Sequence, residues 1–232
     1  MLDGAGVWGH VRAFSTMRGA LYSRPGSAGF YCMDSASTPR LRATFAIYVA
    51  LVAATAVVGP RIMPTGWYYL CGVLGFVCVT LACLGRIWTS LFIAGHKDEE
   101  LVTSGPYALC RHPLYGCSIL GALGLGLTTR SPLLCVSVVA LISALVIYAA
   151  ACEEQFLADA FPERFRAYAA ATPNKWLPKG RGVAWPEHLD VLPAVFWKSF
   201  LDAGSFFLLY LLVALATEYR LLQNVYRIMP TL

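Results

Sequence analysis

The sequence predicts an all-α fold, a polytopic membrane helix bundle with about five transmembrane helices, and two observations support this. Hydrophobic residues make up 58% of the 232 residues and charged residues only 13%, whereas soluble domains carry about 25% charged residues. The apolar residues also form runs near the length of about 20 residues that a helix needs to cross a bilayer. We therefore expect an integral membrane protein.

Five apolar runs account for the predicted transmembrane helices. They cover residues 44–60, 67–88, 112–129, 131–152 and 199–217. The third and fourth runs are separated only by the segment from Thr128 to Ser131. So short a connection predicts a tight reversal and an antiparallel helical hairpin.

The basic residues predict which ends of the helices face the cytoplasm. The segments before, between and after the five runs hold 5, 1, 3, 1, 6 and 2 lysines and arginines, when Arg86 near the end of the second run is counted with the segment that follows it. Cytoplasmic segments are the basic ones, so we expect a cytoplasmic N-terminus in a multi-pass protein of a bacterial inner membrane or the endoplasmic reticulum. The net charge of +5 then reflects topology and attraction to anionic lipid headgroups, and nucleic acid is not an expected partner.

Three regions are expected along the chain. Residues 1–43 form a flexible cytoplasmic segment, 44–178 the membrane core, and 179–232 a connector with an additional C-terminal transmembrane helix. After the fourth run, aromatic and charged residues alternate, which predicts an amphipathic helix at the membrane interface. Pro162 is expected to divide this segment, because proline interrupts helices.

Charged residues at membrane depth are costly and mark functional sites. Four groups qualify: Lys97 to Glu100, Tyr107 with Arg111, His112 and Tyr115, the pair Glu153 and Glu154, and Asp202. The first three are expected on the cytoplasmic face. The predicted hairpin places the start of the third run beside the end of the fourth, so Arg111 and His112 should meet Glu153 and Glu154.

Each of these residues also has a structural explanation. Arg111 suits a positive-inside anchor, and His112 suits an interfacial histidine. Glu153 and Glu154 suit the cap of a following helix, while Asp202 has Lys198 one helical turn away. These explanations would all have to hold at one place, which favours a shared binding site.

A ligand that carries both charges and a flat ring would suit this group of residues. Arginine and histidine would bind a carboxylate, a glutamate would bind an amine or ribose hydroxyls, and tyrosines would contact a ring. S-adenosylmethionine has all of these parts. The chain has no glycine-rich βαβ fingerprint, so helices and loops would form the pocket. Its eight cysteines include no CxxC pair, so no metal site is expected.

Three motifs resemble the isoprenylcysteine carboxyl methyltransferase family, and related phospholipid N-methyltransferases carry a similar pattern. They are LVTSGPYALCRHPLYG from Leu101, EEQFLADAFPERFRAY from Glu153 and TPNKWLP from Thr172. The resemblance implies an integral membrane methyltransferase that uses S-adenosylmethionine in a cytoplasm-facing pocket. It also implies a lipophilic acceptor, prenylcysteine carboxylate-like or a lipid headgroup, that enters sideways from the bilayer.

The resemblance implies positions for the cofactor. The residues expected on the adenosine side are Glu100, Leu101, Val102 and Tyr107. Those expected around the methionine part are His112, Pro113, Leu114 and Tyr115, with Glu153 reaching the cofactor from the far helix of the hairpin.

Arg111 and Glu154 are the expected catalytic residues. Arg111 would bind an anionic group, and Glu154 would act as general base if the acceptor is an amine or hydroxyl. One position departs from the family: an arginine expected one turn before Glu153 is Ala149 here. Two alternatives remain, an NADPH-dependent membrane reductase of the sterol reductase type and a non-catalytic membrane protein with the same fold.

Overall fold

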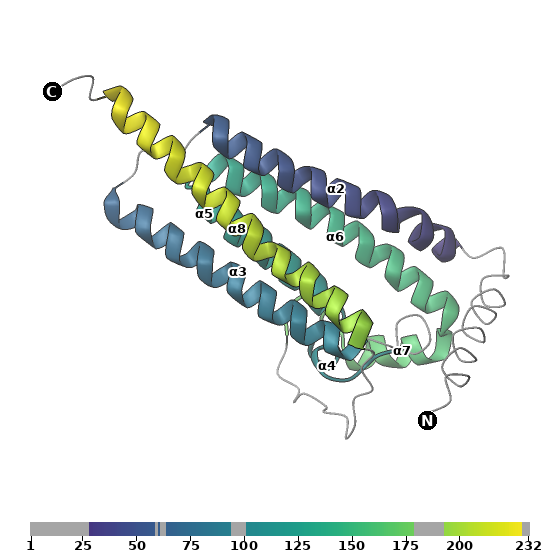
Figure 1. Cartoon of the computed structure of the whole chain (residues 1–232). Helices are drawn as coiled ribbons and strands as arrows, with labels where there is room; N and C mark the ends of the chain where they lie inside the picture. Colours follow the sequence, from purple (N-terminus) through teal and green to yellow (C-terminus); the bar gives the residue numbers. More distant parts are fainter. Residues whose placement is uncertain (1–27, 59, 61–63, 94–100, 179–192, 229–232) are drawn as a thin grey trace, which may run out of the picture.

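The computed structural model describes residues 28–58, 60, 64–93, 101–178 and 193–228, and the regular elements in these residues are all α-helices (Figure 1). This confirms the predicted all-α bundle. The helices are α2 (Ala28–Val58), α3 (Thr65–Ile93), α4 (Pro106–Leu109), α5 (Pro113–Thr128), α6 (Pro132–Ala160), α7 (Pro162–Ala171) and α8 (Pro193–Ile228).

Proline starts five of these helices. The first residues of α4 to α8 are Pro106, Pro113, Pro132, Pro162 and Pro193. Proline lacks the N–H that would be unpaired in the first turn anyway, and its fixed φ suits a helix. The prolines therefore mark where these five helices begin.

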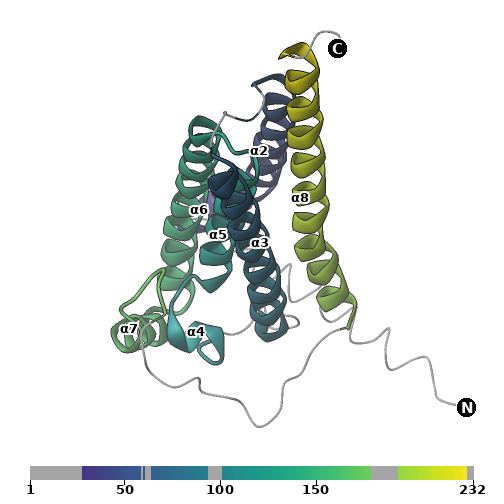
Figure 2. The ribbon, with the colours of Figure 1, turned by 90° about the vertical axis from the view of Figure 1, so that its left-hand side faces the viewer.

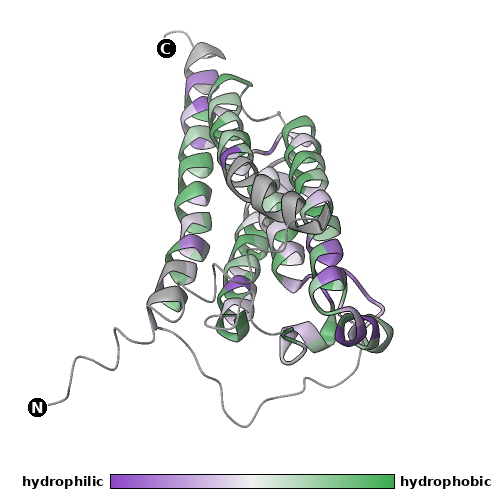
Figure 3. Ribbon diagram, turned by 90° about the vertical axis from the view of Figure 1, so that its right-hand side faces the viewer, coloured by the Kyte–Doolittle hydropathy of each residue, from purple (hydrophilic) through white to green (hydrophobic). Residues whose placement is uncertain are grey.

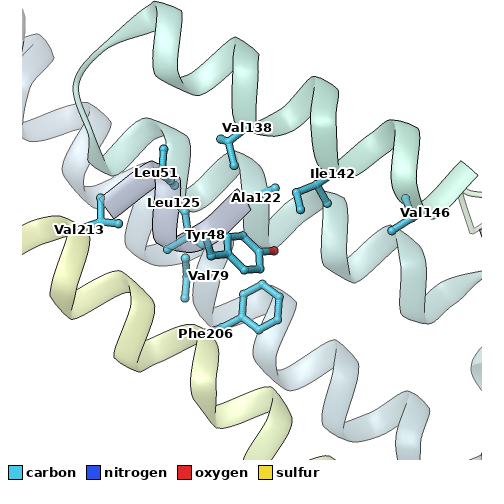
Figure 4. Packing of buried hydrophobic residues seen from close by; sticks show 10 residues of the cluster. All are labelled: Tyr48, Leu51, Val79, Ala122, Leu125, Val138, Ile142, Val146, Phe206 and Val213. Atoms are coloured by element: carbon cyan, nitrogen blue, oxygen red, sulfur yellow. The ribbon is translucent and has the colours of Figure 1, made fainter. Parts of the chain in front are cut away.

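The long helices form a bundle in which α5 lies at the centre. Helix α5 packs against α3, α6 and α8, while α2 packs against α6 and α8. The buried core draws side chains from all five of these helices, among them Tyr48, Val79, Leu125 and Phe206 (Figure 4). Hydrophobic residues run along the helices and hydrophilic ones gather near α7 (Figure 3). This distribution fits a membrane helix bundle.

Helices α3 and α5 touch through their backbones. A Cβ atom on Gly124 would lie 2.7 Å from the carbonyl oxygen of Gly75 and 2.9 Å from the backbone nitrogen of Val79. Only glycine fits such an approach, which is a common way for helices to associate in membranes.

All five predicted runs are helical, but their lengths differ. In the described part of the chain, three helical segments are long and apolar enough to cross a membrane: Thr65–Ile93, Pro132–Ala160 and Ser199–Asn224. Arg42–Val58 and Pro113–Thr128 are shorter apolar helices. The 16 residues of α5 rise about 24 Å, less than the hydrocarbon core of about 30 Å. The expectation of about five spans therefore reduces to three full-length candidates.

The predicted hairpin between α5 and α6 is present, and its turn is closed by local hydrogen bonds. The Thr129 and Arg130 amides donate to the carbonyls of Gly126 and Leu127, each at 3.1 Å. Arg130 has a positive φ of 52°, so the reversal needs only these few residues.

One expectation was wrong: α6 does not end at Glu153 and Glu154 but continues to Ala160, so the pair lies within α6 and caps no following helix.

The polar segments gather at one end of the bundle. Helices α4 and α7 lie together there, beside the start of α5, while the C-terminus of α8 lies at the opposite end (Figure 2). The predicted division at Pro162 is confirmed, because α6 ends at Ala160 and α7 begins at Pro162.

Candidate functional site

The carboxylate of Glu154 contacts three basic side chains. His112 Nε2 lies 3.1 Å from Oε1, and Lys175 Nζ donates to Oε2 at 2.7 Å. Arg111 Nε lies 3.4 Å from Oε1, at ion-pair distance but without hydrogen-bond alignment. The Glu154 side chain is only 18% exposed. The carboxylate is thus well compensated, and the contact between α6 and the start of α5 expected from the hairpin is confirmed.

A loop after α7 is bonded directly to the segment that precedes α5. The Arg111 amide donates to the Asn174 carbonyl at 3.0 Å, and the His112 amide donates to the Lys175 carbonyl at 2.9 Å. The His112 ring lies between two aromatic rings, with centroids 5.7 Å from Tyr115 and 5.5 Å from Trp176. Backbone and side chain of His112 are therefore both fixed, and its ring is buried.

Glu153, the neighbour of Glu154 on α6, lies near enough to Tyr107 and Tyr168 for its charge to act on both phenols. The Tyr168 hydroxyl donates to the backbone carbonyl of Tyr107 at 2.9 Å, which ties α7 to α4. Burial, followed by the charge of Glu153, raises the pKa of Tyr107 well above its usual value. Burial raises the pKa of Tyr168 as well. Both phenols therefore stay protonated and keep their hydrogen for donation at any physiological pH.

A cavity of about 670 Å³ opens beside these tyrosines. It lies between the segment that holds α4 and the helix α7, and small-molecule sites span about 300–1,000 Å³. Its lining residues are Leu101, Thr103, Ala108, Arg164, Ala167, Tyr168, Ala171 and Thr172. Tyr168 thus stands between this cavity and Tyr107.

The residues expected around the cofactor differ in where they lie: some are near the cavity, and others are at the start of α5. Leu101 lines the cavity, and Val102 lies next to it in the chain, partly exposed. Pro113 and Leu114 form the first turn of α5, directly after His112 in the chain. Glu100, with the rest of the group from Lys97, lies outside the described residues.

Sequence reasoning missed two residues of this site. Lys175 binds Glu154, and Trp176 packs on His112. Both belong to the TPNKWLP motif, in which a tryptophan suits a headgroup anchor on sequence grounds alone. Their signal was the rigid loop between Pro173 and Pro178, but nothing in the sequence shows which segment this loop contacts.

Asp202 has a partner on another helix. It forms an ion pair with Arg86 on α3, while the side chain of Lys198, the expected partner, lies outside the described part. Arg86 also donates to Ser118 on α5 at 2.8 Å. A second polar group therefore lies among α3, α5 and α8.

The charged and aromatic side chains around Glu154 could hold a small zwitterionic ligand. In the described part of the chain, no group of three or more His, Cys, Asp or Glu side chains could hold a metal. Arginine, lysine and histidine offer donors to a carboxylate, Glu153 and Glu154 offer acceptors to a cation, and Tyr107, Tyr115 and Trp176 offer ring contacts. These features suit the amino acid and base of S-adenosylmethionine.

The fold and the site define the chain as a helical membrane protein with a cluster of charged residues at one end of its bundle. Residues 63–164 match the phospholipid methyltransferase family, which confirms the predicted resemblance to membrane methyltransferases of this kind. The matched region runs from α3 to the start of α7 and holds Arg86, Arg111, His112, Glu153 and Glu154. It leaves out α8 and the loop with Lys175 and Trp176.

Two curated relatives match part of the chain. A cobalt-zinc-cadmium resistance protein, CzcN, of Cupriavidus metallidurans is 52% identical over 102 residues, which are 43% of this chain and 46% of the relative. A nickel-cobalt-cadmium resistance protein, NccN, of Alcaligenes xylosoxydans xylosoxydans is 46% identical over 101 residues, with the same coverage of 43% and 46%. The match thus spans about half the length of these relatives. No solved structure matches the chain.

Proposed function

We propose that this protein is an S-adenosylmethionine-dependent methyltransferase that acts on a lipophilic acceptor in the membrane. The observation that carries the proposal is the junction at Glu154, where Arg111, His112 and Lys175 converge from two segments on one carboxylate. The match of residues 63–164 to the phospholipid methyltransferase family supports it. We further propose that the cofactor end of the bundle faces the cytoplasm, as the basic segments suggest.

S-adenosylmethionine would supply an electrophilic methyl group on a sulfonium. We propose that Arg111 and His112 bind its carboxylate, that Glu153 binds its ammonium group or ribose, and that Leu101, Val102 and Tyr107 contact the base beside the cavity. Pro113, Leu114 and Tyr115 would form the wall under the His112 ring. Glu100 is assigned to the adenosine side by the resemblance alone. Fixed side chains hold a ligand in one pose, and orientation alone contributes about 7–11 kcal/mol in well-aligned reactions.

The catalytic role of Glu154 depends on the acceptor. Because three basic side chains contact its carboxylate, Glu154 is well suited to orienting His112 and Arg111. A carboxylate acceptor needs no base, so this orienting role is sufficient for methyl ester formation. For an amine or hydroxyl acceptor, Glu154 remains the proposed base, and Lys175 would have to release it.

Binding of radiolabelled S-adenosylmethionine to the purified full-length protein in nanodiscs tests this proposal. We expect His112→Ala and Glu153→Ala each to weaken binding at least tenfold, with Glu163→Gln on the exposed face of α7 as the matched control. Wild-type affinity in both variants would reject the site assignment. Thermal stabilisation by NADPH alone would favour the reductase, and no effect of either cofactor would favour the non-catalytic alternative.

Transfer of a labelled methyl group would identify the acceptor directly. Membranes that contain the protein are incubated with methyl-labelled cofactor, and the lipid and protein fractions are analysed by mass spectrometry. We expect label in a lipid or lipidated fraction, and none with His112→Ala. The two relatives are named for resistance to metals. A second readout is therefore the growth, in the presence of cobalt, zinc or cadmium, of a host that expresses the wild type or His112→Ala.

A further inference from the structure

A second charged group lies at the junction of α3, α5 and α8, which we call the Arg86 cluster: Arg86, Ser118, Asp202 and Phe206. Arg86 Nη1 donates to Ser118 Oγ at 2.8 Å, and Nη2 forms the ion pair with Asp202 Oδ2. The guanidinium also lies over the Phe206 ring, with Cζ 5.2 Å from its centroid. Three helices thus contribute to one arginine site.

The Arg86 cluster lies within the helices, on the side of the bundle that carries Glu154. Arg86 stands about two turns, or roughly 10 Å, before the end of α3 at Ile93, and Ser118 stands roughly 8 Å beyond the start of α5 at Pro113. Ser118 follows Leu114 by one turn on α5 and donates to its carbonyl at 3.1 Å. The cluster is therefore deeper than His112 but on the same helix and at the same end.

The contacts of Arg86 leave part of its binding capacity unused. Its Nε is buried and makes no hydrogen bond to any described residue. The Arg86 side chain is 15% exposed, but that of its partner Asp202 is 58% exposed. A half-exposed ion pair contributes little to stability, whereas an arginine at membrane depth is costly. Holding α8 in place is thus a weak reason for an arginine here.

We propose that Arg86 binds the anionic group of the lipophilic methyl acceptor, a carboxylate or a phosphate, beside Ser118 and in exchange for its ion pair with Asp202. This inference rests on the proposed function. A guanidinium binds either group through two parallel hydrogen bonds, and the exposed Asp202 carboxylate can move aside for the incoming anion. The resemblance places an arginine for the acceptor's anionic group at position 149 on α6, where this chain has a buried alanine. In our proposal Arg86 on α3 supplies this cation instead. Asp202 lies on α8, outside the matched region, which makes this part of the site specific to chains with such a helix.

Binding of two lipophilic probes to the full-length protein in nanodiscs tests the inference and separates the two anion sources. N-acetyl-S-farnesylcysteine offers a carboxylate, and phosphatidylethanolamine offers a phosphate. For the probe that binds, we expect Arg86→Gln to weaken binding at least tenfold and Arg86→Lys to weaken it about threefold. Asp202→Asn should strengthen it about threefold, because the competing carboxylate is gone. Cofactor binding should stay within twofold in all three variants.

Glu218→Gln is the matched control, because Glu218 on α8 pairs with Arg130 at the other end of the bundle. If the ion pairs only hold α8 in place, Asp202→Asn and Glu218→Gln will weaken probe binding equally, and that result overturns the inference. Wild-type probe affinity in Arg86→Gln, or no binding of either probe to the wild type, overturns it too. If the wild-type protein does not bind S-adenosylmethionine, the proposed function is rejected instead.

Discussion

His112 and Glu154 lie 42 positions apart in the sequence and meet at 3.1 Å between Nε2 and Oε1. The contact joins the residue just before α5 to the half of α6 that we propose lies nearer the cytoplasm, across the tight turn at Arg130. The α5–α6 hairpin sets the approach, and the loop with Lys175 closes the other side of the carboxylate. A helical hairpin and one loop are thus sufficient to build a zwitterionic site without a sheet.

Glu154→Gln should destabilise the protein more than Glu153→Gln. Removing the Glu154 charge leaves Arg111, partly buried, and Lys175 without their common partner. Breaking a buried ion pair costs about 3–5 kcal/mol, and we expect about 1–3 kcal/mol here because Lys175 is half exposed. The Glu153 carboxylate makes no ion pair with any described residue, so its replacement is the control. Thermal unfolding in detergent measures both, and equal shifts in Tm would contradict the role of the junction.

Trp176→Ala should loosen the loop that covers His112. The amides of Arg111 and His112 donate to Asn174 and Lys175, so they should exchange slowly with solvent. An aromatic pair adds about 0.5–1.5 kcal/mol beyond its buried area. We therefore expect these two amides to exchange roughly tenfold faster in Trp176→Ala, and Trp176→Phe to restore most of the protection. Mass spectrometry of hydrogen exchange gives the readout, and unchanged rates in Trp176→Ala would show that the loop holds without the ring.

The helices were predictable because their signals are local. Long apolar runs and an initial proline mark α5 and α6, and the short segment from Thr128 to Ser131 predicts their antiparallel pairing. The end of α6 was not predictable from hydropathy, because helix propensity carries the chain beyond Glu154 although the apolar run stops. The partners of Glu154 were half predictable: the hairpin brings His112 and Arg111, but Lys175 arrives through a backbone contact that leaves no sequence pattern.

The Arg86–Asp202 pair shows the same limit. Asp202 has a basic residue one turn away on its own helix, so local reasoning favours Lys198, while its observed partner is 116 positions distant on α3. Packing decides which helix faces α8. One factor is that Gly121 has no side chain: a Cβ there would lie 2.4 Å from the Phe206 ring. Such steric selection depends on three helices together and cannot be read from one of them.

Gly124→Ala should destabilise the bundle, in contrast to Gly204→Ala. A Cβ on Gly124 would lie 2.7 Å from the Gly75 carbonyl and 2.9 Å from the Val79 nitrogen, whereas a Cβ on Gly204 meets nothing within 4 Å. Backbone atoms cannot move aside, so α3 and α5 must separate, at about 1–3 kcal/mol. Alanine at position 204 should instead stabilise α8 by up to about 1 kcal/mol. Thermal unfolding compares the two, and equal Tm values would contradict the backbone contact.

Cys110 should react with alkylating reagents only at high pH. Its side chain lies between α4 and α5, is 3% exposed, and burial raises its thiol pKa from 9.0 to about 11. Since the thiolate is the nucleophile, its fraction at pH 9 is roughly fiftyfold lower than for a thiol with its ordinary pKa. Labelling with iodoacetamide, followed by mass spectrometry of the peptide that contains Cys110, should show a rate that keeps rising between pH 9 and 11.

The same raised pKa sets the sign of a stability effect. The unfolded chain loses the Cys110 proton from about pH 9, whereas the folded chain keeps it to about pH 11. The folded state therefore loses stability as the pH rises through this range, and nothing changes below it. Cys110→Ala should remove this part of the alkaline destabilisation. For the labelling experiment, the control is the protein unfolded in dodecyl sulfate. Equal labelling rates at pH 9 in the folded and unfolded chains would show that the thiol is not shielded.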